Sequence, residues 1–321
     1  MIEVNNLTKR YGPVEAVKDV SFSVGKDQVL GFLGPNGAGK TTIMKILTGY
    51  HFPSAGAVLV DGISVQDDPV AVKSRIGYLP ESVPLYGDLT PLEYLAFIAQ
   101  ARLIPREEQK KKIQSALETC GLKSMAGKKI ENLSKGYKQR VGLAQAIIHD
   151  PPILILDEPT SGLDPNQIIE IRGLIMELGK RKTVILSTHI LQEVEAVCSQ
   201  VLILNEGRIA AQGKPEEIAG TMKGGDTWEL VLKGTDVTAL RDGLGLPEGE
   251  VSPGSINDGP GGTVNVSFFL PVREPGTEWA DGERIFDWAV SRGFKILRMN
   301  RKRFSLEDIF VKLTSEEESQ P

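Results

Sequence analysis

The stretch Gly34-Pro-Asn-Gly-Ala-Gly-Lys-Thr-Thr42 indicates the fold of this chain. It follows the pattern G-x-x-x-x-G-K-S/T, with Lys40 and Thr41 at the last two positions. The apolar run Val29–Leu33 before it predicts a strand, and Thr41–Thr48 after it predicts a helix. Glycines let successive backbone N–H groups point at one anion, and a helix start adds partial positive charge. The stretch therefore predicts a cradle for nucleotide phosphates rather than an ordinary glycine-rich turn.

Two side chains of this loop are expected to carry its chemistry. Lys40 should reach the β- and γ-phosphates, and the Thr41 hydroxyl should complete a Mg2+ shell. The remaining contacts come from the backbone of the loop. The predicted nucleotide-binding residues here are Gly34, Pro35, Asn36, Gly37, Ala38, Gly39, Lys40, Thr41 and Thr42.

Composition and charge are those of an ordinary globular chain. The 321 residues, 25% charged and 40% hydrophobic, are enough for two domains. Residues 226–321 hold 17 acidic and 11 basic side chains, and residues 1–225 are nearly neutral, so nucleic acid is not an expected partner. No apolar stretch approaches the roughly 20 residues of a membrane span, and Met1–Asn5 has no export-signal pattern. The two cysteines, Cys120 and Cys198, are expected to be buried thiols.

Strands alternate with helices through residues 1–225. The short apolar runs Ile153–Leu156, Val184–Leu186 and Val201–Leu204 are typical of a parallel sheet covered on both faces. Further strands are expected over Ile2–Val4, Val20–Val24 and Ala57–Val60, and a mainly helical stretch over about residues 90–150. The predicted fold class of this part is therefore α/β.

A boundary is expected near Lys223–Gly225, followed by a small α+β domain over residues 226–315 and a disordered acidic tail over residues 316–321. Seven glycines and three prolines between Gly243 and Gly262 predict a loose loop. Strands are expected over residues 228–232, 263–270 and 294–299, and helices over residues 237–244, 278–292 and 306–313. The expected core of this domain is Trp228, Phe268, Phe286, Trp288 and Phe294.

Two acidic residues, Asp157 and Glu158, directly follow the apolar run Ile153–Leu156. The end of such a strand is where an open α/β sheet places ligand chemistry. Asp157 is expected to reach the Mg2+ held by Thr41, and Glu158 to polarise a water for attack on the γ-phosphate. Strands often end in acids, so the pair gains its meaning from the phosphate loop upstream.

The segment Leu133-Ser134-Lys135-Gly136-Tyr137 completes a set of three motifs. With the phosphate loop and Asp157-Glu158, it makes the chain resemble the ATP-binding subunits of ABC transporters over about residues 2–220. Taken alone, this basic helix start is equally compatible with a solvated surface. The resemblance implies a P-loop NTPase cassette with a RecA-like core, an antiparallel β subdomain and a helical subdomain, and it implies an Mg-dependent ATPase that binds ATP.

The resemblance also implies a second ATP-binding subunit, most simply a second copy of this chain. In such pairs Ser134 and Gly136 of one subunit cover the γ-phosphate held by Lys40 of the other, giving two equivalent sites. Other matching positions are Tyr11 for stacking on adenine, Asp164 in the loop that links the two sites, and His189 as the histidine that meets the γ-phosphate. Taken alone, Tyr11 and His189 would each be interpreted as structural.

Two positions depart from the family pattern. Glu81, in Gly77-Tyr-Leu-Pro-Glu81, stands where the family usually has glutamine that contacts Mg2+ or water, and Tyr137 replaces a glutamine at the end of the signature. A carboxylate at position 81 still suits Mg2+ but adds negative charge beside ATP. Because Lys40, Asp157 and the other main groups are intact, we expect the substitutions to tune the site.

Residues 77–81 and 304–314 are similar to the ABC-2 exporter branch, and within it to gliding-motility and nitrous oxide reductase copper-processing subunits. The implied partner is a separate membrane permease docking near Pro84, Leu85 and Tyr86, which places the chain peripherally on the cytoplasmic side of the inner membrane. An alternative is a non-transport ABC ATPase acting on nucleic acid or the ribosome, although one cassette without long heptads fits this poorly. A P-loop kinase or GTPase fails to explain the signature segment.

Overall fold

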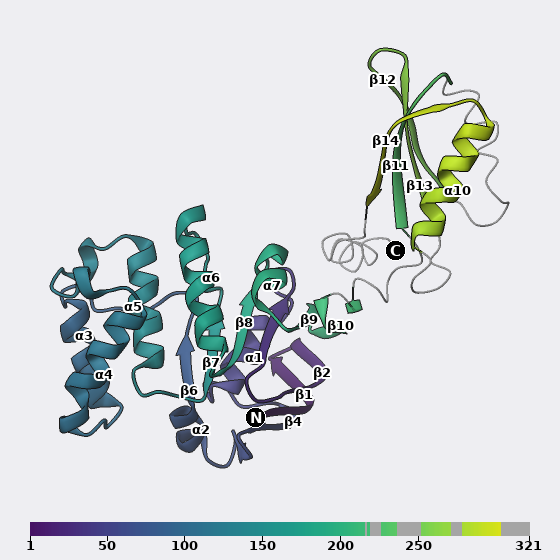
Figure 1. The fold of residues 1–321 in the computed structure, drawn as a ribbon. Coiled ribbons are helices and arrows are strands. Elements are labelled where there is room, and N and C mark those ends of the chain that lie inside the picture. The colour runs from purple at the N-terminus through teal and green to yellow at the C-terminus, as the bar shows by residue number, and fades with distance from the viewer. Residues whose placement is uncertain (216, 219–225, 236–251, 271–277, 303–321) are drawn as a thin grey trace. The chain divides into compact units, whose positions relative to one another are not determined.

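The computed structural model describes residues 1–215, 217–218, 226–235, 252–270 and 278–302 (Figure 1). The chain divides into two compact units, one containing Met1–Pro215 and the other lying within Glu216–Lys312, and each is described by itself. None of the described helices is both long and apolar enough to cross a membrane.

A six-stranded sheet forms the centre of the first unit (Figure 1). Its order is β10-β9-β3-β8-β7-β6, and every pair is parallel except the edge strand β10, which is antiparallel to β9. Every residue of β3, β7 and β8 is buried, as the continuous apolar runs predict for a sheet covered on both faces. The strands are β3 (Val29–Leu33), β6 (Ile76–Leu79), β7 (Ile153–Asp157), β8 (Thr183–Thr188), β9 (Gln200–Asn205) and β10 (Arg208–Gly213).

A four-stranded antiparallel sheet of order β2-β1-β4-β5 shares the hydrophobic core of this unit. Ile2 and Leu7 of this sheet pack in one buried cluster with Phe32 of β3 and Met44 of α1. The long pairing of β1 with β2 follows from a tight turn at Gly12, whose φ of 57° favours glycine. The strands are β1 (Ile2–Tyr11), β2 (Val14–Val24), β4 (Ala55–Val60) and β5 (Ile63–Ser64).

Helices fill the stretch between β6 and β7. Helix α3 begins with a capping box in which Thr90 and Glu93 each accept a hydrogen bond from the other's backbone N–H, and Pro91 fits the first helical position. Ser134 is the N-cap of α5. The helices here are α3 (Pro91–Ala101), α4 (Arg106–Thr119) and α5 (Lys135–Ile147), with single 3-10 turns at Lys123–Met125 and Ile130–Asn132.

Four further helices connect the strands of the first unit: α1 (Lys40–Leu47), α2 (Pro69–Arg75), α6 (Pro165–Gly179) and α7 (Leu191–Val197). The two cysteines are buried at the ends of helices, Cys120 after α4 and Cys198 after α7. Burial raises the pKa of each thiol to about 12. The expected α/β architecture, with a second antiparallel sheet and a helical stretch before β7, is confirmed in this unit.

The second unit is an antiparallel sheet of order β12-β13-β11-β14 with one described helix, α10. Trp228, Leu230 and Val266 of the sheet pack with Ile285 and Trp288 of α10 in a core of their own. The described elements are β11 (Asp226–Lys233), β12 (Ser252–Gly259), β13 (Thr263–Leu270), α10 (Glu278–Ser291) and β14 (Lys295–Lys302).

Two expectations for this part of the chain are wrong. The segment predicted as a loose loop contains strand β12, which is an edge strand among the described strands of this sheet, a position where a proline such as Pro253 is tolerated. Phe286 is 53% exposed, since the helical period places Ile285 and Ala289 on the buried face instead. The side chain of Phe268, the helices expected over residues 237–244 and 306–313, the boundary near residues 223–225 and the tail lie outside what is described.

Candidate functional site

Three strand ends bring the predicted site residues together. Leu33 of β3 pairs with Thr188 of β8, and Asp157 of β7 pairs with Ser187 of β8, so the three carboxyl ends are level. The phosphate loop, Asp157-Glu158 and His189 therefore leave the same edge of the sheet. The phosphate loop, Glu158 and His189 line a cleft of about 280 Å³, and Asp157 adjoins it through its hydrogen bond with Thr41. Its lining is Ala16, Pro35, Asn36, Gly37, Ala38, Gly39, Lys40, Thr41, Thr42, Glu81, Glu158, Ser161 and His189.

The phosphate loop leaves the start of α1 available to an anion. Gly39 precedes the helix with φ of 101°, and a Cβ there would lie 2.8 Å from the carbonyl oxygen of Ala16, so only glycine fits. The helix has no side-chain cap and no acidic residue in its first turn. Its first N–H groups can therefore bind a negatively charged ligand, as the sequence predicts.

Lys40 is buried, at 6% exposed, and its ammonium is held by the loop itself. Nζ donates to the carbonyl oxygens of Gly34 at 2.7 Å and Pro35 at 3.1 Å, and it lies 3.8 Å from Oε1 of Glu158. Burial lowers the pKa of Lys40, and the charges of Glu158, Asp157 and Glu81 oppose that shift. The charged group is thus aimed into the cleft by contacts that a phosphate oxygen can replace.

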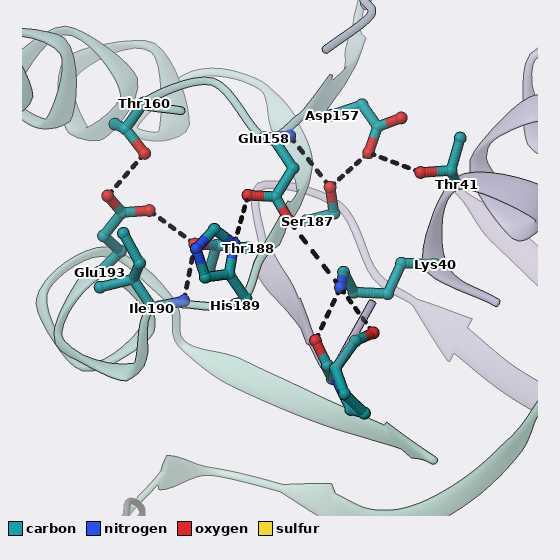
Figure 2. A network of polar contacts seen from close by, with 12 residues as sticks. Lys40, Thr41, Asp157, Glu158, Thr160, Ser187, Thr188, His189, Ile190 and Glu193 are labelled. Atoms are coloured by element: carbon teal, nitrogen blue, oxygen red, sulfur yellow. Dashed lines mark hydrogen bonds and ion pairs between the residues drawn. The ribbon is translucent and has the colours of Figure 1, made fainter. Parts of the chain in front are cut away.

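Asp157 connects the phosphate loop to β8. Its Oδ1 accepts hydrogen bonds from the Thr41 hydroxyl at 3.3 Å and from the Ser187 hydroxyl at 2.5 Å (Figure 2). A hydroxyl and a carboxylate are the hard oxygen ligands that Mg2+ prefers, so these side chains fit a magnesium ion. No group of three or more His, Cys, Asp or Glu in the described part of the chain could hold a metal unaided, and Mg2+ usually keeps phosphate and water ligands.

Glu158 and His189 form a contact pair at the mouth of the cleft. Nδ1 of His189 lies 2.8 Å from Oε2 of Glu158 (Figure 2). Glu158 has φ of 48°, an unfavourable left-handed conformation for this residue type, and its N–H donates to the Ser187 hydroxyl at 3.0 Å. Ser187 therefore supports both acids, because it donates to Asp157 while accepting from Glu158.

Two residues of this network, Ser187 and Glu193, were absent from the sequence-based set. Glu193 accepts hydrogen bonds from the hydroxyls of Thr160 at 2.5 Å and Thr188 at 2.8 Å. The only sequence signal for Ser187 is its place beside His189 at a strand end, and an acid in the helix after the histidine is the only signal for Glu193. Neither pattern is specific without the fold.

Six predicted site residues are absent from the lining of this cleft. Gly34 and Asp157 adjoin it through their hydrogen bonds with Lys40 and Thr41, and the other four lie elsewhere. Tyr11 is 41% exposed at the end of β1, where its ring meets that of His51 at 5.7 Å. Ser134 is exposed at the start of α5, while Gly136 is buried so closely that a Cβ would lie 2.6 Å from Gln167. Asp164 is exposed and caps α6, accepting from the N–H of Gln167 at 2.9 Å.

The two departures from the family pattern fall in different surroundings. Glu81 lines the cleft beside Lys40 and Glu158, while the half-buried Tyr137 donates its backbone N–H to Ser134 at 3.5 Å.

The three residues expected to dock the permease lie in different surroundings. Pro84 lines an apolar groove, Leu85 lines a different hollow, and Tyr86 packs against the rings of Tyr94 and Phe97 while staying 55% exposed.

Comparison with known proteins places this chain in a family. A family model for ABC transporters matches residues 17–161. The ABC transporter ATP-binding protein YxlF of Bacillus subtilis is 34% identical, over 98% of this chain and 99% of its own. The Nod factor export ATP-binding protein I of Ralstonia nicotianae is 33% identical, over 99% and 94%.

A solved structure is also similar. It is the dimeric, post-hydrolysis state of the ATP-binding cassette MJ0796 bound to ADP and Pi, which matches with a TM-score of 0.61 and 27% identity over 67% of this chain and 98% of that one. The fold and the site define a P-loop ATPase cassette. The chain belongs to the ATP-binding subunits of ABC transporters.

Proposed function

We propose that this chain is an Mg-dependent ATPase that dimerises around ATP and powers a separate membrane permease of an ABC-2 type exporter. The observation that carries the ATPase part is the grouping of Lys40, Glu158 and His189 around one cleft below a bare helix start. A chain that only bound nucleotide would have no need of a carboxylate and an imidazole at the mouth of that cleft.

The roles of the three groups follow from their contacts. Lys40 exchanges the carbonyls of Gly34 and Pro35 for phosphate oxygens and meets their negative charge. Glu158 orients and polarises the attacking water, and His189 holds the Glu158 carboxylate through Nδ1. Its other ring nitrogen, Nε2, is left to meet the γ-phosphate.

Thr41 and Asp157 are the residues that would hold the magnesium ion, with Glu81 as a third candidate. When bound, Mg2+ neutralises developing charge on the phosphate oxygens. The chain contributes by fixing both ligands beforehand, since Asp157 already accepts hydrogen bonds from Thr41 and Ser187. Replacing Glu81 by glutamine and measuring the Mg2+ concentration at half-maximal activity tests its part.

Dimerisation would supply the groups that the cleft lacks. Ser134 and Gly136 are absent from the lining around Lys40, and Ser134 is exposed at a helix start, where it is free to meet a nucleotide held by a second copy. The exposed Asp164 suits the contact between the two sites. That the similar cassette MJ0796 is dimeric supports this arrangement. Tyr11 remains our candidate for stacking on adenine, because its ring is 41% exposed and meets His51 edge-on, with Nζ of Lys9 at 5.1 Å from the ring centroid.

The permease is proposed to dock beside the segment after Glu81. Pro84 lines a groove of about 480 Å³ with Tyr50, Ile98 and Arg102, which is mostly apolar and suits one helix of a partner. Export is proposed because the relative in Ralstonia nicotianae is named for Nod factor export. Tyr50→Asp should abolish stimulation of ATP hydrolysis by the permease and leave basal hydrolysis intact. Stimulation that persists in this variant would show that the permease docks elsewhere.

The proposed function is tested with Glu158→Gln, measured beside the wild-type chain by phosphate release and light scattering. The amide keeps the shape of the carboxylate but cannot polarise water as a base, so hydrolysis should slow by about tenfold or more. An ATP-bound dimer should then accumulate. Glu195→Gln, an exposed carboxylate on α7, is the matched control and should behave as wild type.

Two other outcomes would count against the proposal. A wild-type chain that binds ATP without turning it over would contradict the ATPase assignment. A Glu158→Gln chain that stays monomeric with ATP, while wild type turns over, would contradict the roles given to Ser134 and Gly136.

A further inference from the structure

A buried carboxylate lies behind the Glu158–His189 pair and has no part in the chemistry above. Glu193 belongs to the first turn of α7 and is 3% exposed. Its Oε1 accepts a hydrogen bond from the Thr160 hydroxyl at 2.5 Å, and its Oε2 accepts one from the Thr188 hydroxyl at 2.8 Å (Figure 2). Both threonines are themselves buried. One side chain thus joins two segments that are distant in the sequence.

Stability alone does not explain a carboxylate at this place. None of the ion pairs within the described parts of the chain includes Glu193. Removing a carboxylate from water without a cation costs several kcal/mol, roughly, and hydrogen bonds recover only part of it. An apolar side chain would avoid that cost but would leave the buried Thr160 and Thr188 hydroxyls without this acceptor. The positions of the two threonine hydroxyls are therefore more informative about the role of Glu193 than its contribution to stability.

The two threonines flank the two groups at the mouth of the cleft. Thr160 follows Glu158 by two residues, and Thr188 directly precedes His189. Because His189 and Glu158 are in contact at 2.8 Å, the contacts close into a ring that runs through Glu193. Figure 2 shows Glu193 on one side of the pair and Lys40 on the other.

A second contact fixes the direction of the Thr188 hydrogen bond. The Thr188 hydroxyl accepts from the N–H of Ile190 at 3.0 Å, so its proton is left to donate to Glu193. A carboxylate can accept from both threonines at once, while an amide in its place would have to donate to one of them. A carboxylate therefore accepts from both hydroxyls, whereas an amide keeps both contacts only if the Thr160 hydroxyl turns to accept.

The backbone at Glu158 needs such support. Its φ of 48° is unfavourable for a residue with a side chain and persists only where neighbouring contacts hold it. Ser187 holds the segment at the N–H of Glu158, and Glu193 holds it two residues later at Thr160. Without the contact at Thr160, only backbone hydrogen bonds and the Ser187 hydroxyl hold the segment, and the Glu158 carboxylate can shift away from His189.

We propose that Glu193 is a positioning residue for ATP hydrolysis, which acts by holding the Thr160 and Thr188 hydroxyls and so keeping His189 against Glu158. This inference rests on the proposed ATPase function. Glu193 touches none of the residues that hold phosphate in the cleft, so it acts on the rate of hydrolysis and leaves ATP binding unchanged.

The first measurement compares Glu193→Ala with Glu195→Ala in the full chain. Glu193→Ala should lower kcat about tenfold or more while KM for ATP changes less than about twofold, since the interaction acts on the transition state. Glu195 is an exposed acid on the same helix, and its replacement should leave both constants unchanged. Glu193→Gln should fall between wild type and Glu193→Ala.

A double-mutant cycle separates positioning from a general loss of structure. If Glu193 acts through His189, then adding Glu193→Ala to His189→Ala should lower kcat by less than about twofold further. If the double variant instead loses kcat by the product of the two single losses, the proposal is overturned. Thr160→Val and Thr188→Val each remove one hydroxyl at constant volume, so normal kcat in both would also overturn it if Glu193→Ala fails to fold.

The wild-type chain in the same assay keeps the two proposals apart. If the wild-type chain hydrolyses ATP and a folded Glu193→Ala variant has the same kcat, the inference about Glu193 is contradicted and the proposed ATPase function stands. Absence of turnover in the wild type contradicts the proposed function, and this inference falls with it.

Discussion

Lys40 shows, at the scale of a single residue, how the phosphate loop is prepared for its ligand. Its ammonium is already desolvated and donates to two carbonyls of the same loop, with Glu158 at 3.8 Å. Burial lowers the pKa of Lys40, and three nearby acids oppose that shift. Binding a nucleotide then exchanges hydrogen bonds within the loop and does not require the lysine to leave water.

Two glycines of this loop predict different costs for the same substitution. Gly37→Ala meets open space at φ of 87°, so it should cost about 1 kcal/mol of backbone strain. Gly39→Ala adds a Cβ 2.8 Å from the Ala16 carbonyl at φ of 101°, so it should cost about 3 kcal/mol. Urea unfolding without nucleotide measures both, and equal losses would show that the close approach to Ala16 is relieved at little cost.

Single residues of the site differ in how far the sequence could predict them. Lys40 and Thr41 belong to a contiguous pattern whose spacing is itself the signal, so they were identified directly. Ser187 and Glu193 act on partners 30 and 33 residues away, and their meaning depends on which strand ends are neighbours. That information is in the strand order of the sheet and not in any local pattern.

At the scale of elements, α3 and α5 begin in different ways. Helix α3 has a full capping box, in which Glu93 accepts from the N–H of Thr90 at 2.8 Å. Helix α5 relies on Ser134, whose oxygen lies 3.5 Å from the N–H of Tyr137, too long for a strong hydrogen bond. Basic residues follow in α5 with no acid in its first turn. A weak cap at an exposed helix start leaves N–H groups available to an external anion.

Replacing the two caps should therefore separate stability from assembly. Thr90→Ala should lower the free energy of unfolding by about 1 kcal/mol and leave ATP-dependent dimerisation intact. Ser134→Ala should cost less than about 0.5 kcal/mol and greatly weaken ATP-dependent dimerisation, scored in the slow-hydrolysing Glu158→Gln background. Denaturant titration and light scattering give the two quantities. An equal stability loss in both variants would mean that Ser134 serves mainly as a cap.

Elements were predictable where hydrophobic patterning decided them. The runs that became β3, β7, β8 and β9 are apolar enough to be identified without context. Strand β12 was missed because its glycines and Pro253 outweigh a short alternation, and only pairing with β13 makes it a strand. Exposure of Phe286 was missed for a related reason, since α10 turns Ile285 and Trp288 to the sheet instead.

At the scale of the whole molecule, the two units have separate hydrophobic cores. One core joins both sheets of the first unit around Phe32, and the other joins α10 to the second sheet around Trp228. The cleft and its ligating groups belong entirely to the first unit. Each unit therefore has the means to unfold as its own cooperative block.

Heating the full chain should accordingly give two calorimetric transitions. Mg-ATP at about one hundred times its dissociation constant stabilises the unit that binds it by about 2.7 kcal/mol, which raises that Tm by roughly 5–10 °C. The other transition should stay within about 1 °C. Differential scanning calorimetry of Glu158→Gln with and without Mg-ATP provides the test, since hydrolysis is slow there. A single transition shifted as a whole would contradict independent unfolding.

The burial of both thiols has a practical consequence for following the molecule at work. Cys120 and Cys198 are buried, and the pKa of each is raised to about 12, so at neutral pH neither presents a reactive thiolate to an alkylating dye. A cysteine introduced at an exposed position such as Glu195 would take up a single fluorophore while both native thiols remain in place. The proposed ATP-dependent dimerisation could then be recorded in real time on a chain whose two native cysteines are unchanged.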